Sequence, residues 1–122
     1  MPAVPKALIV EDEALIATSL ESILESAGCE VVGWATDCDE ARALAAAHNP
    51  NFAIVDIQLR GGEDGIALAA ELHEERGITI VFVTAQTDPV TVERAKSVPH
   101  HAYVSKPYTA ERILTALPGG GC

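Results

Sequence analysis

The sequence predicts an α/β fold in which a parallel five-stranded sheet is covered by helices on both faces, as a three-layer sandwich. Short runs of branched apolar residues recur along the chain, separated by segments with apolar residues at helical spacing. The runs lack the period-two alternation of half-exposed strands, which indicates strands buried on both faces. Strands that alternate regularly with helices are typical of right-handed βαβ units and a parallel sheet.

The first strand, Ala7–Val10, is a continuous apolar run. The helix after it has apolar residues at helical spacing from Ile16 to Ala27, and Gly28 stands where a helix C-cap belongs. The second strand, Val31–Ala35, contains Trp34, which we expect to pack at the edge of the sheet or against a partner.

Asp37 can cap a second helix, which Asn49-Pro50 ends. The third strand is predicted over residues 52–56. Gly61-Gly62 then break the chain before an Ala-, Leu- and Glu-rich helix over Gly65–Arg76.

The fourth strand is predicted over Ile78–Val83. Asp88-Pro89 combines an N-cap residue with proline at the first helical position, which indicates the start of a fourth helix. A short fifth strand over Ala102–Val104 follows. Thr109 can cap the last helix, and Pro118 ends it.

Length and composition predict one domain with a packed core, because the chain has 122 residues and 48% of them are hydrophobic. We expect the domain to span residues 1–118 and residues 119–122 to form a flexible tail. The net charge of −10 argues against direct contact with nucleic acid or an anionic membrane. No apolar run approaches the roughly 20 residues that a membrane span requires. Three cysteines without metal-ligand spacing, in a chain without a signal peptide, predict free thiols in a reducing cytoplasm.

Polar residues directly follow four of the predicted strands. They are Glu11-Asp12, Asp56, Thr84 and Lys106-Pro107. Parallel strands end on the same side of a sheet, and ligands bind in the crevice outside those ends. We therefore expect three carboxylates, one hydroxyl and one ammonium to share a single pocket.

Three carboxylates in one crevice would repel one another, so the set predicts a bound divalent cation. Ligands that are all oxygen atoms favour Mg²⁺. A carboxylate beside Mg²⁺, an ammonium and a hydroxyl is arranged to attack phosphorus, which makes Asp56 the expected nucleophile. The metal and Lys106 would neutralise the phosphoryl charge, and Thr84 would contact the phosphate oxygens.

Each of these motifs taken alone has a simpler explanation. Acidic residues such as Glu11-Asp12 are common at the positive end of a helix dipole. Asp56 can cap a turn, and Lys106-Pro107 can belong to any surface loop. All four motifs together, each at the end of a predicted strand, are better explained by one site.

The sequence resembles the receiver domain of two-component response regulators over Lys6–Leu117. The matching residues are the acidic pair Glu11 and Asp12, the phosphoacceptor Asp56, the hydroxyl residue Thr84 followed by the small Ala85, the switch aromatic Tyr103, and Lys106-Pro107. The resemblance implies a flavodoxin-like (βα)5 fold with strand order 2-1-3-4-5. It also implies a cis peptide bond between Lys106 and Pro107.

By this resemblance, a sensor histidine kinase or a histidine phosphotransfer protein donates the phosphoryl group. Mg²⁺, with Mn²⁺ as a substitute, would be held by Asp12, Asp56, the main-chain carbonyl of Gln58 and, through water, Glu11. The protein's only chemistry would be its own phosphorylation and dephosphorylation, so it would not be an enzyme in the usual sense.

The resemblance also implies how phosphorylation is read out. Thr84 would move inward and Tyr103 would follow, which would change the face formed by the fourth helix, fifth strand and fifth helix. A downstream protein effector would bind that face. We expect a monomer or weak dimer that acts as a single-domain regulator or a phosphoryl shuttle.

Two features depart from the family pattern. Arg60 stands where many receivers have proline, in a loop that is one residue longer than the common spacing, and we expect this to alter loop stiffness only. Gln58 and Gln86 occupy the positions that tune phosphoryl lifetime in the family. Both are amides that can hydrogen-bond the phosphate or its attacking water.

Two other functions remain open at this point. A pseudo-receiver would have the same fold and serve as a docking module without phosphorylation. An aspartyl-nucleophile phosphohydrolase would normally carry a second carboxylate two residues after the nucleophile, where this chain has Gln58.

Overall fold

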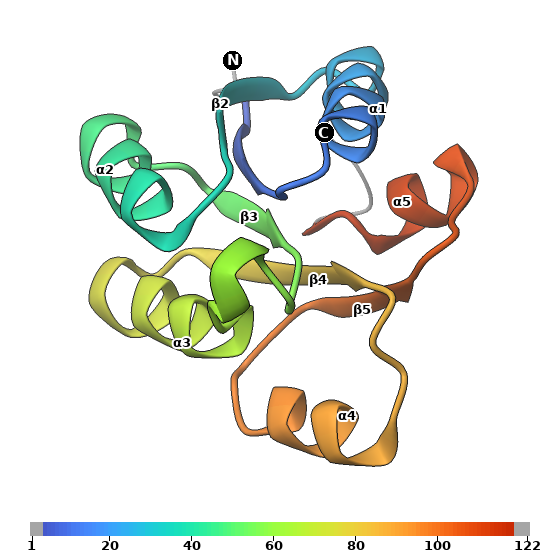
Figure 1. Cartoon of the computed structure of the whole chain (residues 1–122). Helices are drawn as coiled ribbons and strands as arrows, with labels where there is room; N and C mark the ends of the chain where they lie inside the picture. The colour runs from blue at the N-terminus through green and yellow to red at the C-terminus, as the bar shows by residue number, and fades with distance from the viewer. Residues whose placement is uncertain (1–3, 119–122) are drawn as a thin grey trace.

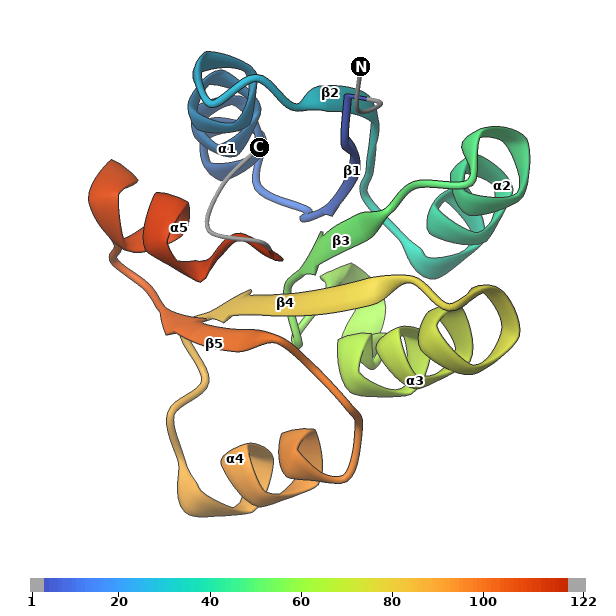
Figure 2. The ribbon, with the colours of Figure 1, turned by 180° about the vertical axis from the view of Figure 1, so that it is seen from behind.

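Five parallel strands form one sheet in the order β2-β1-β3-β4-β5, which confirms the predicted fold. This is a computed structural model that describes residues 4–118, apart from the side chain of Arg60. The strands are β1 (Lys6–Val10), β2 (Glu30–Ala35), β3 (Phe52–Val55), β4 (Thr79–Thr84) and β5 (Ala102–Ser105). The helices are α1 (Ala14–Ser26), α2 (Cys38–His48), α3 (Gly65–Arg76), α4 (Pro89–Lys96) and α5 (Ala110–Ala116), with a short 3-10 turn η1 (Arg60–Gly62) before α3. Figures 1 and 2 show the helices on both sides of the sheet.

The sheet separates two apolar layers. Residues of α1 and α5 pack on one face, where Leu20, Leu24 and Ile113 are fully buried. Residues of α2, α3 and α4 pack on the other face, against Leu8, Phe82 and their neighbours. Burying one such large apolar side chain is worth about 1.5–3 kcal/mol. Burial on both faces explains why the strands read as unbroken apolar runs.

Four of the five α-helices begin with a side-chain cap, which fixes where the preceding loops end. The caps and the amide groups that donate to them are Asp37 with Glu40 (2.8 Å), Asp64 with Ile66 (2.9 Å), Asp88 with Thr91 (3.0 Å) and Thr109 with Arg112 (3.1 Å). Such a cap contributes about 1 kcal/mol. Three of these caps are predicted from the sequence, whereas the cap by Asp64 is not.

Several strand bounds differ by one residue from the prediction, including both bounds of β4, which runs over Thr79–Thr84 rather than Ile78–Val83. β3 ends at Val55 rather than at Asp56, and β5 extends to Ser105. The amide of Asp56 still donates to the carbonyl of Val10 at 2.9 Å. The side chain of Asp56 is therefore held at the strand end although the residue lies just outside β3.

The cysteines require one correction. Cys38 is a free, buried thiol, as expected. Cys29 is disulfide-bonded, so the prediction of a free thiol there is wrong, because an odd number of cysteines gives no indication of pairing. Cys122 and the expected flexible tail over 119–122 lie outside the described residues.

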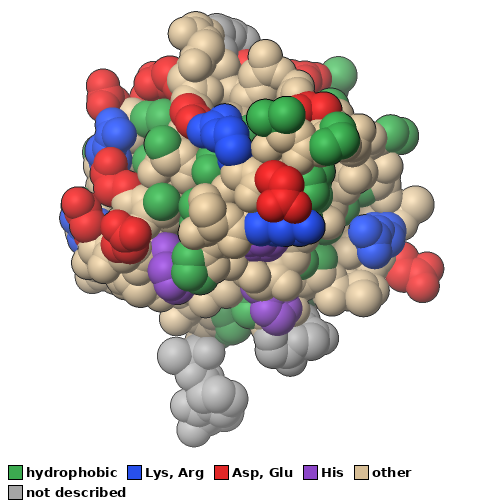
Figure 3. Space-filling view, turned by 90° about the horizontal axis from the view of Figure 1, so that it is seen from below, with side chains coloured by type: hydrophobic (Ala, Val, Ile, Leu, Met, Phe, Trp, Pro, Cys, Tyr) green, Lys and Arg blue, Asp and Glu red, His purple; other side chains and the backbone are tan. Residues whose placement is uncertain are grey.

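Charged side chains of both signs are interspersed on the face that Figure 3 shows, seen from the α4 side. Lys96 pairs with Glu93 within α4 at 3.1 Å, and Arg94 of α4 pairs with Asp64 at the start of α3. Within residues 4–118, no helix has the length and apolar character needed to cross a membrane.

Candidate functional site

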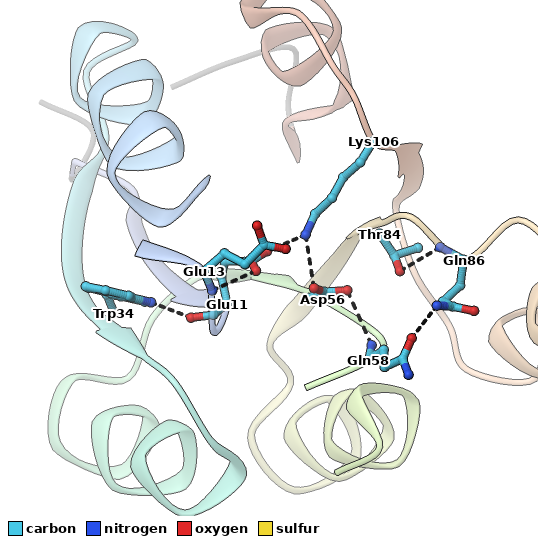
Figure 4. Close-up of polar contacts among 8 residues, drawn as sticks. All are labelled: Glu11, Glu13, Trp34, Asp56, Gln58, Thr84, Gln86 and Lys106. Carbon is cyan, nitrogen blue, oxygen red and sulfur yellow. Dashed lines mark hydrogen bonds and ion pairs between the residues drawn. The ribbon is translucent and has the colours of Figure 1, made fainter. Parts of the chain in front are cut away.

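The predicted site residues lie at the carboxyl ends of β1, β3, β4 and β5. Backbone hydrogen bonds continue past the strand ends and hold these residues in place. The amide of Glu11 donates to Ala35 at 2.9 Å, and the amide of Lys106 donates to Thr84 at 2.9 Å. The side chains consequently converge on one edge of the sheet, as Figure 4 shows.

Lys106 connects two of the carboxylates. Its Nζ lies 2.9 Å from Oε2 of Glu11 and 3.0 Å from Oδ2 of Asp56. The side chain of Lys106 is 11% exposed, while those of Glu11 and Asp56 are 1% and 7% exposed. One ammonium therefore compensates two buried carboxylates in a region that water barely reaches. The Lys106–Pro107 peptide bond is cis.

Burial changes the protonation of this cluster. It raises the pKa of Glu11 to about 7, opposed by the hydrogen bond from Lys106 and assisted by the nearby charge of Asp56. Burial also disfavours the ammonium of Lys106, but its hydrogen bonds to Glu11 and Asp56 outweigh this effect and raise its pKa. Lys106 is therefore charged at neutral pH, whereas the carboxyl group of Glu11 binds a proton more readily than an exposed glutamate does.

An acidic cluster suited to a cation lies beside Lys106. Carboxylate oxygens of Glu11, Asp12 and Asp56 all lie within 4.8 Å of one another. Asp12 is partly exposed, so the cluster can be reached from solvent. A set of three carboxylates fits Mg²⁺ better than softer metals, which prefer thiolate or imidazole ligands.

The carboxylate of Asp56 opens into a pocket of about 290 Å³. The residues around the pocket come from all four strand ends: Asp12, Glu13, Asp56, Gln58, Leu59, Thr84, Ala85, Gln86 and Lys106. Glu11 is not among the lining residues, because its side chain is buried beneath the pocket. The pocket thus brings the carboxylate of Asp56 together with two further carboxylates, an ammonium, a hydroxyl and two side-chain amides.

Two glutamines span the rim of this pocket. The main-chain N–H of Gln58 donates to Oδ1 of Asp56 at 3.3 Å. The main-chain N–H of Gln86 donates to the Thr84 hydroxyl at 3.1 Å. The side chains of Gln58 and Gln86 are hydrogen-bonded to each other (Figure 4). The residues two positions after Asp56 and Thr84 are therefore hydrogen-bonded to each other across the site.

Tyr103 lies outside the pocket but is connected to its rim. Its hydroxyl donates to the main-chain carbonyl of Gln86. Its ring lies 6.0 Å from that of Phe82 and 6.4 Å from that of His100, measured between ring centroids. Tyr103 therefore joins β5 to the loop between β4 and α4.

Gly65 is a residue whose importance for the site does not follow from the sequence pattern. A Cβ atom at this position would lie 2.0 Å from the carbonyl oxygen of Asp56 and 2.9 Å from Cα of Ile57. The Gly65 amide donates to Ile57 at 2.7 Å. Only glycine lets α3 begin this close to the backbone of the acceptor loop.

Trp34 is the second such residue. Its indole Nε1–H donates to the main-chain carbonyl of Glu11, between the edge strand β2 and the loop after β1 (Figure 4). The sequence places Trp34 at the sheet edge but gives no indication of this contact.

The chain matches the response regulator receiver domain family over residues 7–118. The transcriptional regulatory protein PdtaR of Mycobacterium tuberculosis is 40% identical over 116 residues, which cover 94% of this chain and 56% of that protein. The phyllosphere-induced regulator PhyR of Methylorubrum extorquens is 35% identical, with 90% of this chain and 41% of that protein covered. This chain thus spans about half the length of the curated relatives that it matches.

Solved structures show the same likeness. The signal receiver domain of a modulated diguanylate cyclase from Desulfovibrio desulfuricans superposes with a TM-score of 0.86 at 38% identity, covering 93% of this chain and 90% of that chain. A CheY-like receiver domain protein from Methanospirillum hungatei gives a TM-score of 0.83 at 27% identity, with 92% and 89% covered.

Proposed function

This chain belongs to the response regulator receiver family, and on that premise we propose that Asp56 accepts a phosphoryl group in two-component signal transduction. Receiver domains are in general signalling domains rather than enzymes. The observation that carries the proposal is the position of Asp56: its carboxylate opens into the pocket while Lys106 contacts it at 3.0 Å.

The proposed reaction is a transfer from phosphohistidine. A carboxylate oxygen of Asp56 forms a bond to phosphorus, the phosphorus–nitrogen bond breaks, and the imidazole nitrogen of the donor keeps the electron pair. Lys106 is placed to neutralise the charge of the incoming phosphoryl oxygens. The Thr84 hydroxyl lies at the same rim and can donate to one of those oxygens.

We propose that a divalent cation, Mg²⁺ or in its place Mn²⁺, is held by Asp12, Asp56 and the main-chain carbonyl of Gln58, with Glu11 acting through water. The clustering of carboxylate oxygens within 4.8 Å supports this assignment. When bound, the cation supplies positive charge that offsets the negative charge on the phosphoryl oxygens.

The signal would pass through Thr84 and Tyr103. Movement of the Thr84 hydroxyl toward the phosphate would lengthen the bond that it accepts from the main-chain N–H of Gln86, now 3.1 Å. The Tyr103 hydroxyl is bonded to the carbonyl of the same glutamine, so both contacts change together. We propose that these changes shift the balance between the inactive and active conformations of the face formed by α4, β5 and α5.

The side chains of Gln58 and Gln86 are proposed to set the phosphoryl lifetime. Their mutual hydrogen bond joins two residues that line the same pocket as Asp56. A phosphoryl group on Asp56 would offer both amides new acceptor oxygens.

We propose a sensor histidine kinase or histidine phosphotransfer protein as the donor, and a protein effector at the α4–β5–α5 face as the target. We propose that this reaction takes place in the cytoplasm, where ATP-dependent kinases act. The interspersed charges on the α4 side are compatible with a protein partner and give no basic patch for nucleic acid (Figure 3). The receiver domain is proposed to span residues 1–118 and to work as a monomer or weak dimer.

Intact-mass spectrometry after incubation with acetyl phosphate tests the proposal. The wild type should gain one phosphoryl adduct only when Mg²⁺ is present, and Asp56→Asn should gain none. A wild type that gains no adduct, and whose melting temperature does not change with beryllofluoride and Mg²⁺, would instead be a pseudo-receiver that docks without phosphorylation. An adduct of equal yield in Asp56→Asn would mean that another residue is the acceptor.

A further inference from the structure

The side chain of Trp34 contacts the backbone of the loop that carries the acidic pair. Trp34 belongs to β2, the strand at the edge of the sheet, and its side chain is 37% exposed. Its indole Nε1–H is hydrogen-bonded to the main-chain carbonyl of Glu11. Figure 4 shows the indole reaching toward Glu11 from the side opposite to Lys106.

This bond fixes a peptide unit rather than a side chain. The carbonyl of Glu11 and the amide nitrogen of Asp12 belong to one planar peptide group, so the direction of one sets the direction of the other. The amide of Glu11 is itself held by Ala35 of the same strand at 2.9 Å. β2 therefore holds the chain on both sides of Glu11, once through backbone and once through the indole.

The contact bears directly on the proposed metal site. Glu11 and Asp12 supply two of the three clustered carboxylates, and Asp12 is the more exposed of the two. The side chain of Glu11 is anchored by Lys106 and by the amide of Glu13 at 3.1 Å. The direction of the Asp12 side chain depends on the peptide group that precedes it, and the indole of Trp34 contacts that peptide group.

We propose that Trp34 is a positioning residue for the acidic pair: its indole N–H orients the Glu11–Asp12 peptide so that the carboxylates face a divalent cation. This inference rests on the proposed function, because it assigns a role in cation binding at the same site. It goes beyond that function by making an exposed edge-strand tryptophan a determinant of metal affinity.

The test compares Trp34→Phe, which keeps an aromatic ring and removes the N–H donor, with the wild type. Isothermal titration calorimetry should show a rise in the Mg²⁺ dissociation constant of roughly two- to tenfold, as expected for the loss of one neutral hydrogen bond. With acetyl phosphate, the Mg²⁺ concentration for half-maximal phosphorylation should rise by the same factor, while the rate at saturating Mg²⁺ stays unchanged.

Leu15→Ala is the matched control, because it removes an apolar side chain next to the acidic pair that is 88% exposed. Its Mg²⁺ dissociation constant should equal that of the wild type. The wild type supplies an independent readout, since Trp34 is the single tryptophan of the sequence. Its fluorescence should change on Mg²⁺ addition, with a midpoint that agrees with calorimetry.

An unchanged dissociation constant in Trp34→Phe would overturn the proposal, and so would an equal rise in Leu15→Ala. If Trp34→Phe does not fold, the fluorescence of the wild type provides the test instead. Calorimetry that shows Mg²⁺ binding, together with tryptophan emission that does not change on Mg²⁺ addition, would contradict the role of Trp34. Failure of the proposed function is distinct, because then the wild type would bind Mg²⁺ without being phosphorylated, or would not bind it at all.

Discussion

The ammonium of Lys106 lies 3.0 Å from a carboxylate oxygen of Asp56, although 50 residues separate them in the chain. The same ammonium lies 2.9 Å from Glu11. The strand order explains both contacts, because β1 and β3 are neighbours and the backbone of Lys106 is held to the end of β4. The acceptor is thus held by the end of the chain's last strand.

Replacing Lys106 with Met should destabilise the Mg²⁺-free protein. At pH 8 the buried carboxylates of Glu11 and Asp56 would lose their cation, which costs about 3 kcal/mol of unfolding free energy. Urea denaturation in the presence of a chelator measures this. Lys96→Met serves as the control, because its pair with Glu93 is exposed and should contribute less than about 1 kcal/mol. Equal losses in the two variants would contradict the role given to Lys106.

Without Mg²⁺, stability should fall as the pH rises from about 5 to 8. The pKa of Glu11 is raised from 4.5 to about 7, so in this range the native state binds more protons than the unfolded state. The stabilisation is complete below pH 4.5 and is lost as the pH passes 7, a change on the order of 1–3 kcal/mol. Chemical denaturation at several pH values measures the slope. Glu11→Gln should flatten it, and an equal slope in this variant would assign the effect to other groups.

Mg²⁺ should raise the melting temperature, because it binds the folded acidic cluster and not the unfolded chain. Millimolar Mg²⁺ should stabilise the protein by roughly 1–3 kcal/mol, and more at pH 8 than at pH 6, where a proton competes at Glu11. Thermal melts with and without chelator provide the measurement. Asp12→Asn should remove most of the effect; a variant that responds like the wild type would exclude Asp12 as a ligand.

Gly65→Ala should destabilise the fold far more than Gly33→Ala. The added Cβ at Gly65 would meet the backbone oxygen of Asp56 at 2.0 Å, and backbone cannot move aside without displacing the acceptor. At Gly33 the added atom would meet the end of the Leu44 side chain at 2.8 Å, which can change rotamer. We expect a loss above about 3 kcal/mol for Gly65→Ala and near 1 kcal/mol for Gly33→Ala. The urea concentration at the midpoint of unfolding should therefore fall further for Gly65→Ala than for Gly33→Ala. Similar midpoints for the two variants would show that the loop after Asp56 can move to accommodate the added atom.

Much of the fold follows from sequence because each strand is a continuous apolar run and each loop carries a recognisable cap or break. The polar residues at the strand ends could be placed in one pocket for the same reason, since a parallel sheet brings all its carboxyl ends together. Contacts along the chain, such as the cap of α4 by Asp88, are local and therefore readable.

The contacts that the sequence does not predict depend on the register of strand pairing and on the close approach of two backbone segments. A shift in the pairing of β1 with β2 between Ala7 and Leu8 sets Ile9 opposite Trp34. A shift by one residue would turn the indole to the other face, and the sequence contains no signal for it. The need for glycine at Gly65 is equally invisible, because it arises from the Asp56 carbonyl across a loop.

The raised pKa of Glu11 is also a product of burial rather than of composition. Repulsion among three carboxylates is predictable from the sequence, but the nearly complete burial of Glu11 is not. Its ion-pair partner, Lys106, lies 95 residues further along the chain.

Locating the phosphoryl group by mass spectrometry tests directly whether Asp56 is the acceptor. The protein is incubated with acetyl phosphate and Mg²⁺, reduced with borohydride to convert an acyl phosphate to an alcohol, and digested for peptide mass spectrometry. We expect homoserine at position 56 alone, and no homoserine when Mg²⁺ is chelated. Homoserine at Asp12 instead, or a reduced product formed equally without Mg²⁺, would contradict it.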